Sequence, residues 1–294
     1  MSNAGHIDLA ETLPKAHPPV LLFGKALLAN RSFLIGFGLF LLIALLSVFA
    51  DLVAPYNPSL SNFRIKLQPP SEAHWFGTDH FGRDILSRAL YGGRLSLLIG
   101  ISVVVFTGAF GTLIGALAGY FRKLDNLIMR IMDAMMAFPS ILLAITVAAT
   151  LGASVTNVII ALGIATTPHT ARIVRASVLV VREMEYVEAA RALGAGHMRI
   201  LFRHILANSL APLIVRLTYV FASVILAEAV LSYIGVGPPP PTPTLGGIIA
   251  NGRDFMVEAP WVTLFPGVIV LVLVLGLNLL GDGLRDVLDP RIKA

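Results

Sequence analysis

The sequence predicts an all-α polytopic membrane protein with six transmembrane helices. Hydrophobic residues make up 56% of the 294-residue chain and charged residues only 13%, whereas a soluble domain carries about 25% charged residues. Six apolar runs approach or exceed the roughly 20 residues that a helix needs to cross a bilayer. Polar residues are concentrated between these runs and at the two ends, which is typical of a multi-span protein.

Composition excludes several classes of function. The chain has no cysteine, so disulfides, cysteine-ligated metal sites and a thiol nucleophile are excluded. The net charge of +5 is typical of basic loops that face the cytoplasm and anionic lipid, and we expect no nucleic-acid partner. The sequence has no GxxxxGKS or GxxxxGKT, HExxH or GxSxG motif, so we expect no catalytic residue and no enzyme activity of its own.

The N-terminal part is expected to hold one span between a tail and a loop. Residues 1–32 are polar and contain prolines, which indicates a flexible tail. The apolar run at 33–54 is long enough to span, and it lacks the early position and cleavage site of a secretory signal, so we predict an uncleaved first helix. In the outer loop at 55–94, apolar residues between Asp84 and Tyr91 predict a short helix at the membrane interface.

Five further spans are predicted between residues 95 and 284. Six spans place both termini on one side of the membrane, and lysine and arginine are concentrated in the tail, in the loops at 121–131 and 172–206, and in the C-terminal segment 285–294. Because basic residues are enriched in cytoplasmic loops, both termini are predicted to be cytoplasmic. The five spans are expected at about 95–120, 133–151, 157–181, 207–234 and 261–284.

A polar stretch at 185–208, between the fourth and fifth predicted spans, has internal order. Its apolar residues between 186 and 193 recur at i, i+3, i+4 and i+7, which places them on one face of a helix. Gly194 interrupts that helix, and Met198 and Leu201 begin a second apolar face. A simple connector needs no such order, so we predict two short helices that form a docking surface for another protein.

Three glycines lie at every fourth position of the second predicted span: Gly111, Gly115 and Gly119. In lipid, a stripe of small residues lets another helix approach closely. Tight packing within this chain and an interface with a second subunit both fit the stripe.

Ionisable residues inside the predicted spans are candidates for a substrate pathway. A charge at mid-bilayer costs about 2.5–3.5 kcal/mol on insertion scales, so such residues usually face a protein interior or an aqueous path. Glu228 and Arg216 lie in the fifth span, and His169 follows Pro168 in the fourth. A role in packing the bundle fits the same three residues.

The outer loop contains residues of the types that bind divalent metals, namely His74, Asp79, His80 and Asp84. Their spacing matches no closed metal site, and a credible site must show ligand number and geometry. A solvated loop is therefore the favoured interpretation, and we predict no metal site.

Four stretches resemble one family of transport proteins. EAARALGAG at 188–196, followed by RILFRHIL at 199–206, resembles the EAA loop in the membrane subunits of binding-protein-dependent ABC importers. FGTDHFGRDILSRALYGGRLSL at 76–97, LAEAVLSYIGVGPPPPTPTLG at 226–246 and NLLGDGLRDVLDPR at 278–291 are similar to stretches of the peptide and nickel permeases, and the resemblance covers roughly 30–294. One departure is Ala207, which stands where the family often has proline.

The resemblance implies a type I ABC importer permease fold with a cytoplasmic EAA coupling helix in a loop at 182–206. The implied substrates are dipeptides or oligopeptides, and nickel or another metal chelate is the alternative within the family. An ATP-independent carrier or channel is a less favoured alternative. By the same resemblance, coupling to an ATPase would involve Glu188, Ala189, Ala190, Arg191, Gly194, Met198 and Leu201.

The resemblance also implies several partners. A second, related permease would form the other half of the translocation pathway, and a periplasmic or lipid-anchored binding protein would deliver the substrate. Two cytoplasmic ABC ATPase subunits would use ATP and Mg, so the chain itself is expected to bind no cofactor. Its location would be the bacterial inner membrane, in contact with membrane lipid.

Overall fold

Helices form almost all of the regular structure. A computed structural model describes residues 19–288, which contain helices, loops and one isolated β-bridge between Thr78 and Asp84. The tails predicted at 1–32 and 285–294 lie partly outside the described residues. The five longest helices are α2 (Arg31–Val48), α4 (Ile85–Tyr120), α7 (Val155–Val181), α10 (Leu210–Tyr233) and α12 (Trp261–Leu288).

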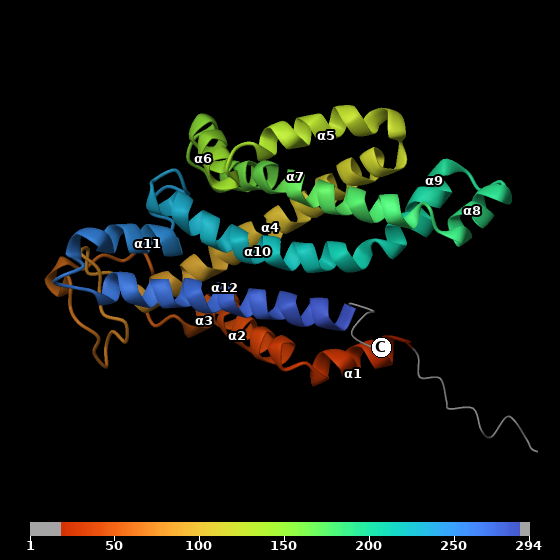
Figure 1. Ribbon diagram of the computed structural model, residues 1–294. Coiled ribbons are helices and arrows are strands. Elements are labelled where there is room, and N and C mark those ends of the chain that lie inside the picture. The colour runs from red at the N-terminus through yellow and green to blue at the C-terminus, as the bar shows by residue number, and fades with distance from the viewer. Residues whose placement is uncertain (1–18, 289–294) are drawn as a thin grey trace, which may run out of the picture.

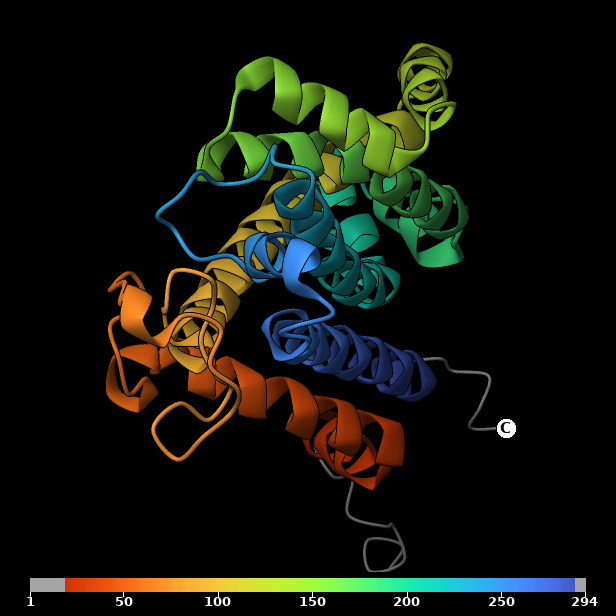
Figure 2. The same cartoon turned by 90° about the vertical axis from the view of Figure 1, so that its left-hand side faces the viewer.

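Shorter helices connect or flank the long ones. They are α1 (Pro19–Ala29), α3 (Ala50–Val53), α5 (Arg122–Met136), α6 (Ser140–Leu151), α8 (Glu185–Ala192), α9 (His197–Arg199) and α11 (Leu245–Gly252). Figure 2 shows α2 and α12 as one layer and α5, α6 and α7 as another, with α4 crossing between them.

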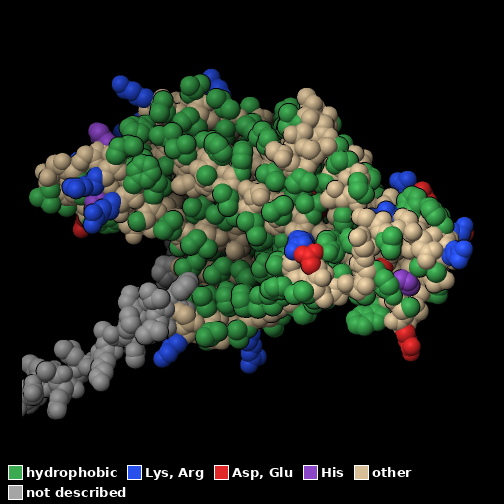
Figure 3. Space-filling model, turned by 180° about the vertical axis from the view of Figure 1, so that it is seen from behind, with side chains coloured by type: hydrophobic (Ala, Val, Ile, Leu, Met, Phe, Trp, Pro, Cys, Tyr) green, Lys and Arg blue, Asp and Glu red, His purple; other side chains and the backbone are tan. Residues whose placement is uncertain are grey.

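The molecule has two polar ends and an apolar middle. Figure 1 shows α8 and α9 at one end, towards which α12 also runs, and α11 at the opposite end beside the loop formed by 55–84. In Figure 3, charged side chains gather mainly at these two ends, while hydrophobic side chains cover most of the surface between them. Such a belt is the surface that a bilayer requires, because charged groups in hydrocarbon are costly.

Four helices within residues 19–288 are long and apolar enough to cross a membrane: α2, α4, α10 and α12. α5 and α6 meet at a bend of 87°, and if that pair counts as one span there are five. The predicted multi-span helical architecture is therefore confirmed, while α7 is not among these candidates and the full set of six spans stays a prediction.

Two predicted elements differ from the structure. The separate short helix expected between Asp84 and Tyr91 is wrong, because these residues form the N-cap and first turns of the continuous 36-residue α4. Ile85 and Ala89 are fully buried there, so they contact other parts of the protein and not lipid. The span expected at 133–151 is instead divided, since Pro139 separates α5 from α6.

The glycine stripe of α4 lies directly against α7. A Cβ atom at Gly115 would stand 2.4 Å from the carbonyl oxygen of Ala171, and Cβ atoms at Gly111 and Gly119 would stand 2.8 Å from side chains of α7. The stripe thus packs two helices of the same chain. A second contact of this kind joins α2 to α12, where a Cβ at Gly36 would lie 2.4 Å from the Leu280 nitrogen.

Candidate functional site

The loop at 182–206 forms two short helices joined by a left-handed turn. Gly194 has φ of +81°, which glycine adopts without the strain that a Cβ would cause. Its N–H donates to the Arg191 carbonyl, and the N–H of Ala195 donates to the Ala190 carbonyl, both at 3.0 Å. This pair of bonds is the Schellman arrangement that ends a helix, so Gly194 fixes the end of α8.

The inner face of this loop is anchored to α7. Val187, Ile200 and Ile205 are at most 1% exposed and pack in one cluster with Val178 and other valines of α7. Leu201 is also buried, at 3% exposed. This residue, named above for ATPase coupling, therefore supports the loop from behind and is not available at its surface.

The outer face of the loop is apolar and uncovered. Tyr186, Leu193, Met198 and Phe202 are 44%, 89%, 63% and 55% exposed, and we name these four residues the docking crest. Charged residues lie among them. Of the other predicted coupling residues, Glu188, Ala189, Arg191 and Gly194 are exposed, and Ala190 is partly buried.

The end of the loop runs into α10 through Ala207, the position at which the resemblance led us to expect proline. Residues Ile200–Leu206 are π-helical, and Ala207 continues with helical φ and ψ of −57° and −36°. The hydroxyl of Ser209 donates to the Ile205 carbonyl at 3.0 Å, just before α10 begins at Leu210. The backbone thus carries the loop directly into the next long helix.

Glu228 is fully buried between α4 and α10. Its two carboxyl oxygens accept hydrogen bonds from the hydroxyls of Ser96, at 2.6 Å, and Ser232, at 2.8 Å. A buried polar group needs such partners, so these bonds account for its position. The geometry favours the packing role of Glu228 over contact with a substrate.

Arg216 and His169 lie elsewhere. Arg216 lines a cavity of about 440 Å³ together with Tyr219 and Arg285, near the end of the molecule that carries α8. His169 is exposed on α7. Neither His169 nor Glu228 lines that cavity, so the structure does not bring the three candidate pathway residues together.

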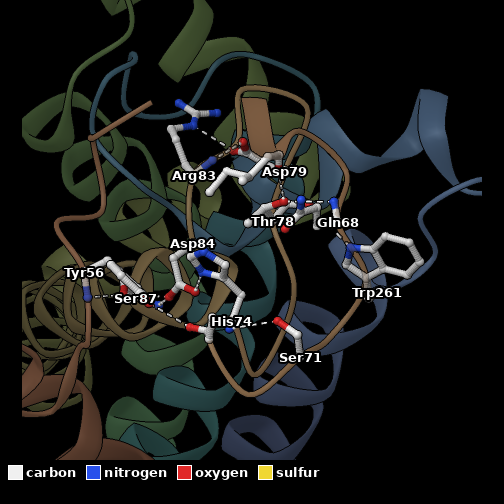
Figure 4. Close-up of polar contacts among 12 residues, drawn as sticks. Tyr56, Gln68, Ser71, His74, Thr78, Asp79, Arg83, Asp84, Ser87 and Trp261 are labelled. Carbon is white, nitrogen blue, oxygen red and sulfur yellow. Dashed lines mark hydrogen bonds and ion pairs between the residues drawn. The ribbon is translucent and has the colours of Figure 1, made fainter. Parts of the chain in front are cut away.

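The loop at 55–84 is folded into a compact lobe at the opposite end (Figure 4). His74 Nδ1 lies 2.9 Å from Asp84 Oδ1, and Asp84 Oδ2 accepts from the backbone and side chain of Ser87, each at 2.7 Å. Asp84 thereby caps the N-terminus of α4. Tyr56 joins the same group, since its backbone N–H donates to the Ser87 hydroxyl at 3.2 Å.

Asp79 organises the tip of the lobe. Its Oδ1 accepts from the backbone N–H groups of Phe81 and Arg83, at 2.8 and 2.9 Å, and its Oδ2 accepts from Arg83 Nε at 2.7 Å. Gly82 has φ of +70°, and a Cβ there would lie 1.8 Å from the Asn62 oxygen. Only glycine fits this crossing of two chain segments.

The protein contacts described above explain the positions of the residues that were considered as metal ligands. His74, Asp79 and Asp84 bond to protein groups, and residues 19–288 contain no group of three His, Cys, Asp or Glu arranged to hold a metal ion. His80 lies between the rings of Phe81 and Phe255, and burial lowers its pKa below the usual 6.5. Most residues of 55–73 are exposed, as a solvated loop predicts, whereas His74, Asp79 and Asp84 are buried and held by internal bonds.

Sequence reasoning missed two ion pairs that hold α5 on α7. Arg175 makes two hydrogen bonds to Asp125, at 2.5 and 2.6 Å, and Arg172 pairs with Asp133. Opposite charges were visible in the sequence, but their partners are 50 and 39 residues away. Only the folded chain shows which acid meets which base.

Two protein-family descriptions match most of the chain. Residues 111–294 match the family described as "Binding-protein-dependent transport system inner membrane component". Residues 21–70 match the "N-terminal TM domain of oligopeptide transport permease C".

Individual relatives agree with the family match. A Brucella abortus protein named for a peptide transport system is 52% identical over 275 residues, covering 94% of this chain and 93% of the relative. The dipeptide transport system permease protein DppC of Alkalihalophilus pseudofirmus is 46% identical over 92% of this chain and 89% of its own length. Among solved structures, an inward-facing MetNI methionine ABC transporter chain matches with a TM-score of 0.57 at 22% identity, covering 68% of this chain and 95% of that chain.

Proposed function

Because this chain belongs to the family of binding-protein-dependent transport system inner membrane components, we propose that it is the permease subunit of an ATP-driven importer of dipeptides or short peptides. The names of the relatives support peptides, since they include dipeptide and D,D-dipeptide transport permeases. They favour peptides over nickel as the cargo. The chain would lie in a bacterial inner membrane, with both termini in the cytoplasm.

The six spans of this permease would be α2, α4, the bent pair α5 and α6, α7, α10 and α12. α7 is less apolar than the other spans because its middle carries Thr167, His169 and Arg172. Its contact with the glycine stripe of α4 supports a place in the bundle, where Thr167 is buried, while a second permease or an aqueous path would face the exposed His169 and Arg172. The fold of the MetNI chain supports the same type I arrangement.

The main support for coupling to an ATPase is the exposure of the docking crest. Four large apolar side chains are exposed at a polar end of the molecule, outside the apolar belt, where water makes their exposure unfavourable. A cytoplasmic ATPase would cover this crest with a groove of its own, and Glu188 and Arg191 would make polar contacts around it. Leu201 would instead hold the loop against α7.

A movement of the ATPases would be transmitted to the membrane helices through the face of the loop that packs on α7. Val187 and Ile200 are packed into the α7 cluster, and the π-helical segment continues into α10. A displacement of the crest would therefore move α7 and α10 together instead of bending a free loop. ATP and Mg would be used by two ATPase subunits, and this chain would supply no ATPase site.

Two further partners complete the proposal. A second, related permease would form the other half of the pathway. A periplasmic or lipid-anchored binding protein would dock at the opposite end of the molecule, where the 55–84 lobe and the segment around α11 lie side by side. The rigid internal bonding of the lobe supports this role, because a preorganised surface loses little entropy on binding.

Substitution of Gly194 tests the coupling proposal. Gly194→Val would force a β-branched residue into a left-handed conformation, costing about 1–3 kcal/mol locally and distorting the crest. We expect ATP hydrolysis by the reconstituted complex to continue while peptide uptake falls at least severalfold. Gly194→Asn, which tolerates that conformation, should restore most of the uptake.

Gly152 provides a matched control. It also has positive φ, at +88°, and has no atom within 4 Å of a built Cβ, but it lies between α6 and α7 and away from the crest. Gly152→Val should leave the ratio of uptake to hydrolysis unchanged. Equal loss of coupling in both valine variants, or full uptake in Gly194→Val, would remove the crest from the mechanism.

A further inference from the structure

A cleft of about 610 Å³ lies between the α4–α5 junction and the loop that carries the docking crest. Four basic residues line it, Arg122, Lys123, Arg182 and Arg191, together with one acidic residue, Glu183. We name it the cationic cleft. The cleft lies at the junction of α4 and α5, which Figure 1 shows on the same side of the molecule as α8 and α9.

Most of this positive charge is uncompensated. Arg182 donates to the Glu183 carboxylate at 2.9 Å and to the Gly119 carbonyl at 2.7 Å. Arg122, Lys123 and Arg191 form no ion pair with any other residue between 19 and 288. The cleft therefore has a surplus of cations with donors free to bind an anion.

The backbone adds further donors at the same place. α5 starts at Arg122, and no side chain caps its N-terminus. Within the described part of the chain, the N–H groups of Arg122 and Lys123 have no hydrogen-bond acceptor. Unpaired amides at the start of a helix attract phosphate oxygens, because the helix dipole is positive there.

An exposed apolar stripe leads away from the cleft along α5. Leu124 lines the cleft, Leu127 and Ile131 follow at i+3 and i+7 on the same side of the helix, and Phe138 lies in the turn just beyond its end. All four are between 42% and 64% exposed. The last three line an apolar groove of about 460 Å³.

We propose that the cationic cleft binds the phosphate of an anionic phospholipid, with an acyl chain lying along the α5 stripe. The cations and free amides match a phosphodiester, and the stripe begins where the glycerol backbone of the lipid would leave the cleft. A free phosphate ion would match only the cleft. A soluble acidic protein would leave the apolar stripe without a function. The cleft shares Arg191 with the coupling loop, but none of the four docking-crest residues lines it, and the site does not depend on the nature of the transported substrate.

Lipid titration of the purified full-length chain in detergent tests this site. The thermal unfolding midpoint would be followed against added phosphatidylglycerol, phosphatidylcholine or inorganic phosphate. We expect phosphatidylglycerol to raise the midpoint, and the other two to have little effect. The double variant Arg122→Gln with Lys123→Gln should raise the lipid concentration for half-maximal protection by about fivefold for each cation removed.

Matched control variants distinguish binding at this site from effects of net charge or of exposed apolar surface elsewhere on the protein. Arg64 and Lys66 are an exposed basic pair in the lobe at the other end, so Arg64→Gln with Lys66→Gln should leave the phosphatidylglycerol titration unchanged. Leu127→Ser should weaken protection, whereas Leu271→Ser, at a similarly exposed residue of α12, should not.

Several outcomes would overturn the proposal. Equal protection by phosphatidylcholine would show that the headgroup charge is not recognised, and equal protection by inorganic phosphate would show that no lipid is needed. Equal weakening by the two double variants would show a general effect of net charge. Loss of ATPase co-purification in Arg122→Gln with Lys123→Gln, with unchanged phosphatidylglycerol protection, would assign the cleft to a protein partner.

Discussion

At the scale of single residues, the carboxyl group of Glu228 is held by two hydroxyls and no cation. Glu228→Gln can keep both contacts, because an amide accepts from Ser96 and donates to Ser232, so we expect nearly unchanged stability and uptake. Glu228→Ala leaves both hydroxyls without their partner, which costs about 1–3 kcal/mol for each group that remains unsatisfied. Thermal unfolding of the purified variants measures this difference.

The same two variants distinguish a structural role of Glu228 from a role in the transport pathway. A Glu228→Gln protein that folds normally but no longer takes up peptide would show that the acid itself is needed on the pathway. That result would reverse the interpretation drawn from the buried position of Glu228.

The outer acids show why residue roles were only partly predictable. Asp79 and Asp84 are the right type for a metal ligand, for a helix cap and for a turn, and local sequence does not separate these roles. The role of each acid depends on contacts between residues that are not neighbours in the sequence. Examples are the contact of His74 with Asp84 and that of the Asn62 oxygen with Gly82. Gly194 was predictable, because a glycine after a helical apolar pattern is itself a strong sign of a helix end.

At the scale of elements, α4 is longer than predicted, because one helix contains both the expected loop helix and the second span. Gly92 and Gly93 lie where a break between a loop helix and a span was expected, yet the helix is continuous. Their small size serves contact instead: a Cβ at Gly93 would lie 2.4 Å from the Ser47 hydroxyl, and one at Gly92 would lie 3.0 Å from the Leu245 nitrogen. Sequence alone does not distinguish a flexible glycine from one required by a neighbour.

The bend between α5 and α6 had a local signal. A residue before proline is biased away from the helical conformation, so Phe138 followed by Pro139 marks a probable helix boundary. The continuous apolar pattern of 133–151 concealed this boundary, because hydrophobic periodicity indicates which side of a helix is buried and not whether the helix axis is straight.

The 55–84 lobe should loosen in acid. The pKa of His80 is lowered by desolvation, with repulsion from Arg83 and Arg88 adding to this and attraction from Asp79 and Asp254 opposing it. Because the folded lobe binds a proton less readily than the unfolded segment, this contribution is present above about pH 6.5 and is lost as pH falls towards the lowered value. The hydrogen-exchange protection factors of residues 55–84, which correct each amide's exchange rate for its intrinsic pH dependence, should therefore fall between pH 7 and pH 5.

Replacing the histidine gives the control for this pH dependence. His80→Gln does not titrate, so the acid-induced fall in protection factors should be smaller in that variant, whatever its protection at pH 7. An equal pH response in both proteins would assign the effect to another group.

At the scale of the whole molecule, the sequence predicted the architecture well because bilayer thickness constrains it. Hydrophobic length and the distribution of basic residues predicted a multi-span helical protein with a polar loop at one end. The same patterns could not show that α2 packs on α12 or that α5 is tied to α7. Those contacts depend on glycines and ion pairs whose partners are distant in the chain, such as Gly36 with Leu280.

The absence of cysteine makes the orientation of the two ends directly testable. Leu193 of the docking crest is 89% exposed, and Val257 near α11 is 98% exposed, so a single cysteine at either position should disturb the fold little. With a thiol reagent that cannot cross membranes, Val257→Cys should react in spheroplasts and Leu193→Cys only in inside-out vesicles, because the topology proposed from the basic residues puts the crest end in the cytoplasm. Labelling of Leu193→Cys should then fall when the ATPases are present, since docking would cover the crest. Labelling of Leu193→Cys from outside intact spheroplasts would invert the topology and remove the crest from the reach of any cytoplasmic ATPase.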